Sequence, residues 1–363
     1  MIGLRERMLD AYYGQAHERT PIGIYSRYLS RGAREREFRN RGLGIIDYIP
    51  PTTLLAPPWH LYDEFLSPVD GAHLTVKRHW NGQTWVERRT YETPVGSIWQ
   101  ESEKDEGGVG SEHIRKHYIA SPEDYRTMTY LVRHALFLDN SPRIQDRLRE
   151  LGSDGVVLGR LDRSPYQKCL IELVGPERFL VDLHVDPEPV LELMTAMGSR
   201  MDEAFERALE SPLEILWQPD NVTSHMTPPD AFETFLLPFY RKRAMAAEAA
   251  GKRYLVHMDG KLNALSRLID ESGVHAVESF TLPDMGGDLS LAEARALFPK
   301  AIPHPSLPSN WFVLGDDELR QRAGLLMEEL RGSPSMLQVS EDIPPAALDR
   351  LLDFVIGAAG KRP

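Results

Sequence analysis

A histidine and an aspartate two residues apart mark the most reactive segment of the chain, His257-Met258-Asp259-Gly260. The segment follows a largely apolar run, residues 253–256, and precedes a helical pattern over 262–269. Side chains two apart on a strand point to the same face, so the imidazole of His257 and the carboxylate of Asp259 can converge on one ligand. Such a pair suits metal binding or acid–base chemistry on a substrate.

Polar residues also end the other predicted strands. Unpaired buried charge is costly, so apolar strands that finish in His, Asp, Glu or Gln are hard to explain by packing alone. The set comprises Tyr25 and Arg27, with Arg31 four residues further on; Gln218, Asp220 and Asn221; Glu278; His304 and Ser306; and Ser340, Glu341 and Asp342. The combination of His257 and Asp259 at one strand end with Glu341 at another favours a functional site.

Several of these residues have a structural alternative that the sequence leaves open. Asp220 and Asp342 begin loops, where aspartate often caps a helix. His257 equally fits a core histidine bonded to a backbone carbonyl. His304 lies between two prolines and fits a structural or surface role.

The elements that must position these residues alternate between strand and helix, which favours parallel strand pairing. We expect a (β/α)8 TIM barrel of the α/β class, a single domain over 1–363 that begins with a helical segment. Chemistry in such a barrel belongs to the C-terminal strand ends. The predicted strands are 22–25, 45–48, 155–161, 214–218, 254–257, 276–280, 301–304 and 336–339, and the predicted helices are 3–15, 31–41, 122–151, 176–184, 187–209, 228–250, 262–272, 290–298, 316–331 and 345–359.

One stretch breaks this alternation. Residues 74–97 alternate on both sides of Asn81-Gly82, which is the strongest short signal for a β-hairpin. We therefore expect an antiparallel hairpin insertion at about residues 70–112, which ends in a polar loop over 101–112.

Composition excludes several classes of function. The 363 residues carry a formal net charge of −12, which argues against a nucleic acid or an anionic membrane as partner. The single cysteine, Cys169, rules out an intrachain disulfide and a zinc site of several thiolates. Arg5, Glu6, Arg7 and Asp10 lie where a signal peptide needs an apolar core, and no run approaches the about 20 apolar residues of a membrane span, so we expect a cytoplasmic protein.

Residues 220–260 resemble the uroporphyrinogen decarboxylase superfamily. The likeness lies in Pro229-x-x-Phe232, in Leu237-Pro238-Phe239-Tyr240 and in the strand that ends His257-x-x-Gly260. TYETPVGSIWQ and YIASPEDYRTM resemble segments of its corrinoid-dependent methyltransferase branch. The resemblance covers nearly the whole chain, most strongly 160–350, and it implies a TIM barrel that often forms homodimers.

The methyltransferase branch implies zinc, held by His-x-Cys and a later cysteine, that activates a thiol acceptor. His257 matches the histidine, Asp259 stands where the first cysteine would be, and Glu341 falls near the second. One imidazole with two carboxylates still permits zinc, but also another divalent metal or none. The methyl group would come from a corrinoid on a separate protein or from a small methylated compound.

The decarboxylase branch is the second implication. The spacing Arg27-x-x-x-Arg31 resembles its N-terminal arginine motif, which would hold substrate carboxylates, although the two arginines equally fit a surface pair. The late Gly-His motif of that branch is replaced here by Ser340-Glu341, and its catalytic aspartate has no clear match near Asp47.

The leading expectation is therefore a methyltransferase-like enzyme, with a metal-independent decarboxylase or a non-catalytic ligand-binding barrel as alternatives. In this hypothesis His257, Asp259 and Glu341 hold the metal. The catalytic residues are His257, Asp259, Glu341 and Asp220, and the substrate-binding residues are Arg27, Arg31, Tyr25, Gln218, Glu278 and His304.

Overall fold

The computed structural model of the chain describes residues 3–28, 32–52, 68–105 and 112–360. Arg31, one of the predicted substrate-binding residues, lies outside these ranges. Within them, no helix is both long enough and apolar enough to pass through a membrane.

Eight parallel strands form the central sheet, in the order β11-β10-β9-β8-β7-β2-β1-β12. A parallel bridge between Ser306 and Gln338 joins the two outer strands, so the sheet closes and the predicted TIM barrel is confirmed. The strands are β1 (Ile22–Tyr25), β2 (Leu43–Ile49), β7 (Gly155–Arg160), β8 (Ile215–Val222), β9 (Arg253–Met258), β10 (Ala276–Phe280), β11 (Ile302–Pro305) and β12 (Leu337–Val339).

Helices lie between successive strands, and their starts follow from local sequence. Ser290, for example, caps the helix that follows it by accepting a hydrogen bond from the Glu293 amide. The helices are α1 (Leu4–Tyr12), α2 (Ala33–Asn40), α3 (Pro122–His134), α4 (Ser141–Leu151), α5 (Pro165–Lys168), α6 (Pro176–Val185), α7 (Pro187–Glu210), α8 (Pro229–Ala231), α9 (Leu237–Ala249), α10 (Ser266–Ser272), α11 (Leu291–Leu297), α12 (Asp316–Leu330) and α13 (Pro345–Ala359).

The N-terminal helix α1 packs at the start of the barrel strands. Met8 of α1 lies against Gly44 of β2 so closely that a Cβ at Gly44 would stand 2.2 Å from the methionine sulfur. Tyr12 of α1 reaches further inside, where its hydroxyl accepts a hydrogen bond from Gln338 of β12. Because α1 fills this end of the barrel, the polar strand ends at the opposite end are left for a site.

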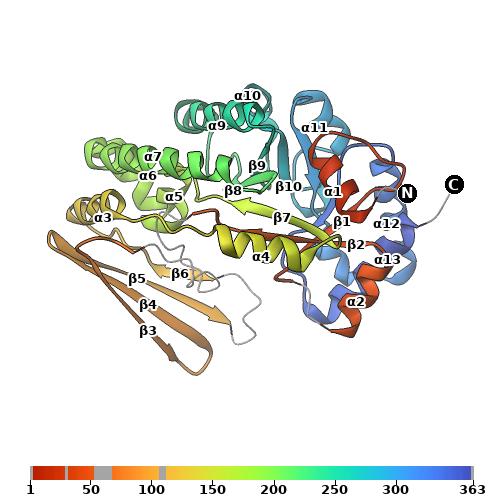
Figure 1. Cartoon of the computed structure of the whole chain (residues 1–363), viewed down its shortest axis with the longest axis horizontal. Helices are drawn as coiled ribbons and strands as arrows, with labels where there is room; N and C mark the ends of the chain where they lie inside the picture. The colour runs from red at the N-terminus through yellow and green to blue at the C-terminus, as the bar shows by residue number, and fades with distance from the viewer. Residues whose placement is uncertain (1–2, 29–31, 53–67, 106–111, 361–363) are drawn as a thin grey trace.

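The insertion is a separate antiparallel sheet of β3 (His73–Trp80), β4 (Thr84–Thr93), β5 (Gly96–Asp105) and β6 (His113–Lys116) (Figure 1). Its first turn is the predicted Asn-Gly hairpin, with Trp80 paired to Trp85. The predicted polar loop over 101–112 is wrong for 101–105, which continue β5. These residues stay extended because they pair with β4, where Glu101 also binds Arg88 at 2.9 Å.

Candidate functional site

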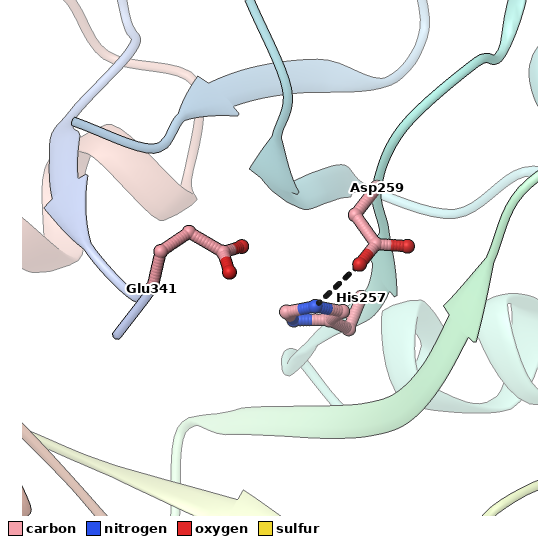
Figure 2. Close-up of side chains that lie close together, drawn as sticks. All are labelled: His257, Asp259 and Glu341. Atoms are coloured by element: carbon pink, nitrogen blue, oxygen red, sulfur yellow. Dashed lines mark ion pairs between the residues drawn. The ribbon is translucent and has the colours of Figure 1, made fainter. Parts of the chain in front are cut away.

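Three potential metal ligands meet at the C-terminal ends of β9 and β12 (Figure 2). His257 lies near the end of β9, Asp259 follows that strand, and Glu341 follows β12. One ligand atom from each lies within 4.8 Å of the others. His257 Nε2 is 3.8 Å from Asp259 Oδ2. The chain turns away directly after Asp259, because Gly260 adopts a φ of +64° that favours glycine.

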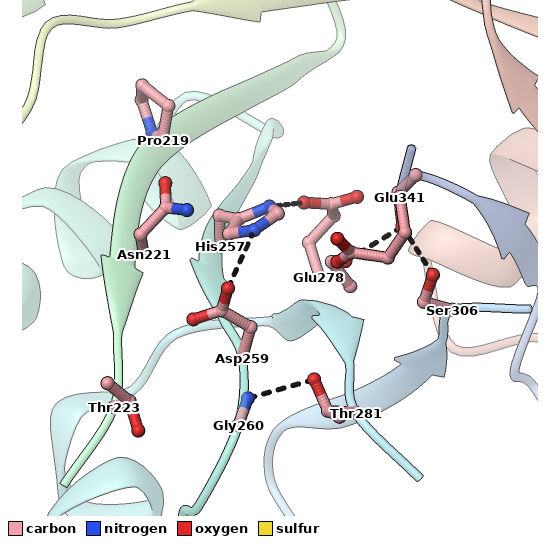
Figure 3. A network of polar contacts seen from close by, with 12 residues as sticks. Pro219, Asn221, Thr223, His257, Asp259, Gly260, Glu278, Thr281, Ser306 and Glu341 are labelled. Carbon is pink, nitrogen blue, oxygen red and sulfur yellow. Dashed lines mark hydrogen bonds and ion pairs between the residues drawn. The ribbon is translucent and has the colours of Figure 1, made fainter. Parts of the chain in front are cut away.

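Glu278 of β10 fixes the orientation of the histidine (Figure 3). Its fully buried carboxylate lies 2.7 Å from His257 Nδ1 through Oε2. The same carboxylate accepts a hydrogen bond from Trp217 Nε1 at 2.9 Å and another from the Tyr25 hydroxyl. The carboxylate acts as an acceptor, so Nδ1 carries a proton and Nε2 is the atom that faces Asp259.

Ser279 positions the third ligand. It has a φ of +60°, rare for a residue with a side chain, and it lies at an irregularity in the pairing of β10 with β11. Its hydroxyl donates to Glu341 Oε1 at 3.0 Å and lies 2.7 Å from the Ser340 hydroxyl. The strained backbone at Ser279 therefore positions the hydroxyl group that binds Glu341.

The electrostatics of the cluster favour bound positive charge. Burial alone would lower the pKa of His257, but the adjacent Glu278 and Asp259 carboxylates raise it to about 10. Burial raises the pKa of Glu341, which His257 opposes and Asp259 reinforces. The three carboxylates around the His257 imidazole therefore attract a cation. A metal ion could bind His257 Nε2 in place of its proton.

A divalent metal fits this donor set. One imidazole and two carboxylates are common ligands of zinc and of other first-row metals. The contact of His257 Nδ1 with Glu278 is the carboxylate–histidine arrangement that typically supports a metal-binding imidazole. His257, Asp259 and Glu341 would supply the ligand atoms, while Glu278 and Ser279 would orient them.

A cavity opens beside the cluster, with about 720 Å³ of empty space when the solvent at its open mouth is included. Aromatic side chains form much of its wall, and charged residues of both signs face it. The lining residues are Tyr25, Arg27, Tyr28, Tyr48, Arg160, Arg163, Trp217, Pro219, Asn221, His257, Asp259, Ser340, Glu341 and Asp342.

The cavity brings together some of the residues predicted from sequence. His257, Asp259 and Glu341 line it, as do Tyr25 and Arg27. Glu278 lies beneath this wall, where it contacts His257 and Tyr25. The other predicted residues within the described ranges, Gln218, Asp220 and His304, do not line this cavity.

Asp220 and Gln218 are bonded within the wall of the barrel. Asp220 is not a loop cap but part of β8, which extends past the predicted end at 218 through a bulge. Its carboxylate accepts hydrogen bonds from the Tyr240 hydroxyl at 2.5 Å and the Ser164 amide at 2.8 Å. Gln218 accepts from the Tyr254 hydroxyl at 3.1 Å. The Asp220 contacts attach α9 and the residue before α5 to β8, and the Gln218 contact joins β8 to β9.

His304 belongs to the core. It is fully buried in β11, and its Nδ1 accepts a hydrogen bond from the Met336 amide at 3.0 Å. The ring of Tyr12 packs edge-on against it with the ring centroids 5.0 Å apart. Burial lowers the pKa of His304 to about 3, so the ring is neutral. The strand predicted at 301–304 is present as β11, and of the roles that the sequence left open for His304 the structural one is observed.

Sequence reasoning missed two basic residues of the cavity, Arg160 and Arg163. Arg160 is the last residue of β7, and Arg163 follows it by three positions. Both residues lie at the C-terminal end of the strand predicted at 155–161. Reading the end of strand 155–161 in the same way as the other strand ends would have found them.

Among the comparisons with known proteins, only the one with solved structures finds a similar protein. No protein-family model and no curated protein sequence matches the chain. A solved structure, a methyltransferase from Methanosarcina mazei, is similar over 99% of this chain and 98% of its own, with a TM-score of 0.59 and 11% sequence identity. At that identity the likeness demonstrates a shared fold.

Proposed function

We propose that this chain is an enzyme that transfers a methyl group to or from a small acceptor, with a divalent metal held by His257, Asp259 and Glu341. The convergence of their ligand atoms within 4.8 Å carries the proposal. The fold shared with a protein described as a methyltransferase supports the choice of reaction. Membership of the uroporphyrinogen decarboxylase superfamily is part of the same proposal.

In the proposed reaction, the acceptor atom gives up its proton to water and forms a bond to the methyl carbon. The bond between that carbon and the donor breaks, and its electron pair stays on the donor. A bound divalent metal, zinc or another, would bind the acceptor and lower its pKa. The methyl donor that we propose is a corrinoid on a separate protein or a small methylated compound.

The residues of the chain orient the reactants. Glu278 holds the His257 ring, and Ser279 holds Glu341, so the ligand atoms need little rearrangement. Tyr25 and Trp217 both line the cavity and donate to Glu278, so the aromatic wall is rigid. An aromatic wall packs against the substrate and excludes water from the reacting atoms.

Decarboxylation of a small carboxylate is a second candidate. The observation in its favour is that the cavity contains Arg27, Arg160 and Arg163 as well as the acidic residues. Arginines would bind the carboxylate. Glu341, whose pKa burial raises, would then return a proton to the carbon that loses carbon dioxide.

Metal analysis combined with an anaerobic methylcobalamin assay tests the two reactions. We expect about one equivalent of divalent metal per chain and a change in the cobalamin spectrum when a thiol acceptor is added. Glu341→Gln should lose both signals, whereas Asp342→Asn, which alters the neighbouring cavity residue outside the cluster, should keep them.

The same protein should be supplied with candidate carboxylic acids, and carbon dioxide should be measured. Carbon dioxide release that persists after chelator treatment, without cobalamin demethylation, would overturn methyl transfer in favour of decarboxylation.

A further inference from the structure

Arg163 is held firmly in the wall of the cavity. Its side chain is only 5% exposed. Nε donates to Glu172 Oε1 at 2.9 Å, and Nη1 donates both to the Pro219 carbonyl and to Asn221 Oδ1, the latter at 2.9 Å. Three contacts to two different elements leave this guanidinium little freedom to move.

A buried ion-pair network supports Arg163 from behind. Lys168 Nζ lies 2.9 Å from Glu172 Oε2 and 2.6 Å from Asp162 Oδ1. Burial disfavours ionisation of Glu172, yet Lys168 and Arg163 lower its pKa to about 2. The ionised Glu172 carboxylate therefore binds the Nε side of the Arg163 guanidinium. This contact fixes the position of Arg163 before any ligand binds.

The Nη2 group of Arg163 remains available to bind a ligand. Its Nη2 makes no hydrogen bond to any residue within the described ranges, although the side chain lines the cavity. An arginine edge that faces a cavity and has no protein partner is suited to an anionic ligand, because a charge-assisted hydrogen bond satisfies it.

Asn221 adds a second donor to this wall. It has a φ of +51° and lies at the bulge in β8, where the backbone turns its side chain toward the cavity. Its amide oxygen accepts from Arg163, so the amide nitrogen points the other way, and Figure 3 shows that nitrogen on the side of His257. This donor and Arg163 Nη2 therefore belong to one continuous surface.

We propose that Arg163 and Asn221 form an oxyanion subsite that binds the carboxylate, sulfonate or phosphate group of a small substrate. Asp259 and Glu341 line the same cavity and repel an anion from the cluster that they form with His257, whereas Arg160 strengthens the positive potential beside Arg163. The substrate class is a short molecule with an oxyanion at one end and a thiol, hydroxyl or amine at the other. Only the thiol, hydroxyl or amine end of this substrate depends on the proposed metal function. The oxyanion end does not.

Calorimetric titration with acetate, methanesulfonate and methylphosphonate tests the subsite, because these probes share a methyl group and differ in the oxyanion. Chelator-treated protein at constant chloride should saturate with at least one of them. Arg163→Met should weaken that binding by about tenfold, the value of one charge-assisted hydrogen bond. Arg149→Met, on the outer surface of α4 with a side chain 75% exposed, should bind as wild type does.

Asn221→Gly separates loss of the subsite from loss of folding. Glycine adopts a φ of +51° without strain, so this variant should unfold at the same urea concentration as wild type or higher. It should still bind the probe about threefold to tenfold more weakly. Failure of all three probes to bind wild type, or wild-type affinity in both variants, would overturn the subsite.

Glu341→Gln distinguishes the subsite from the metal function. It removes one metal ligand but leaves Arg163 and Asn221 unchanged. We expect its affinity for the probe to equal or exceed that of wild type, since the substitution removes a repelling carboxylate and keeps both donors. In the wild-type protein, probe binding without metal binding would retain the subsite and reject the metal, and metal binding without probe binding would reject the subsite alone.

Discussion

His257 and Glu278 occupy paired positions on neighbouring parallel strands, with the histidine Nδ1 2.7 Å from the glutamate Oε2. Paired residues of a barrel point to the same side of the sheet, so the register of β9 and β10 alone brings the two groups together. The shared contacts of Glu278 with Tyr25 and Trp217 then fix its own position. The architecture of the barrel therefore turns Nε2 of His257 toward Asp259.

Replacing Glu278 with glutamine should weaken metal binding. A glutamine offers one acceptor oxygen to three donors and turns an NH2 group toward one of them. We expect about 10-fold to 100-fold lower zinc affinity, the usual effect of losing the partner of a metal-binding histidine, measured by competition with a chromophoric chelator.

Tyr25→Phe provides the matched control. It removes one donor to Glu278 and leaves the contact with His257 in place. Its zinc affinity should fall by less than that of Glu278→Gln. Equal affinity in wild type and Glu278→Gln would show that Glu278 does not orient the histidine.

Replacing Asp259 with cysteine should shift metal preference toward zinc. Thiolate is a softer ligand than carboxylate, so the ratio of zinc affinity to manganese affinity should rise by about tenfold or more. Loading with Co²⁺ should produce a thiolate-to-metal absorption band. Cys169 gives no background, since it is fully buried and away from the cluster. Asp342→Cys should show neither effect, and a band there would place the metal elsewhere.

The barrel could be predicted from the sequence because its signals are local and repeated. Apolar strands alternate with helices of suitable length, and each strand end carries a polar residue. The Asn81-Gly82 turn likewise fixed the hairpin without knowledge of the rest of the fold. His257 and Asp259 were found together because their spacing of two on one strand decides their direction.

The burial of a polar residue could not be predicted, because it depends on partners distant in sequence. Gln218 and His257 both lie near strand ends, yet Gln218 is bonded to Tyr254 inside the wall and His257 faces the cavity. The bulges at Asn221 and Ser279 redirect side chains, and no local pattern marks them. The strand at 301–304 was predicted, but the burial of His304 in it was not, because that burial depends on Tyr12 and Met336, which are distant in sequence.

Lys168→Met should destabilise the fold by about 3–5 kcal/mol, because it removes the buried ammonium that pairs with Asp162 and Glu172 and leaves Glu172 with Arg163 alone. Urea unfolding measures the change. Lys300→Met is the matched control: its ammonium also pairs with an aspartate, Asp270 at 3.0 Å, but its side chain is 66% exposed. That variant should lose less than about 1 kcal/mol. Similar losses in the two variants would contradict the importance of burial.

His304 should make the fold sensitive to acid. In the unfolded chain the residue takes up a proton near the ordinary histidine pKa of 6.5, whereas burial lowers the pKa of the folded residue to about 3. The unfolded state therefore binds more protons between these values, and stability falls as the pH drops through that window. The expected loss from this residue is about 1.4 kcal/mol per pH unit below 6.5. Urea unfolding at about pH 7.5 and pH 5.5 measures it.

His304→Asn isolates this contribution from that of other histidines. Burial also lowers the pKa values of His117 and His275, which act in the same direction in both proteins. Asparagine can still accept the hydrogen bond from the Met336 amide, but it does not titrate. The variant should be less stable than wild type at neutral pH. Its free energy of unfolding should, however, fall less than that of wild type between the two pH values. An identical pH dependence in both proteins would mean that folded His304 takes up its proton as readily as the unfolded chain does.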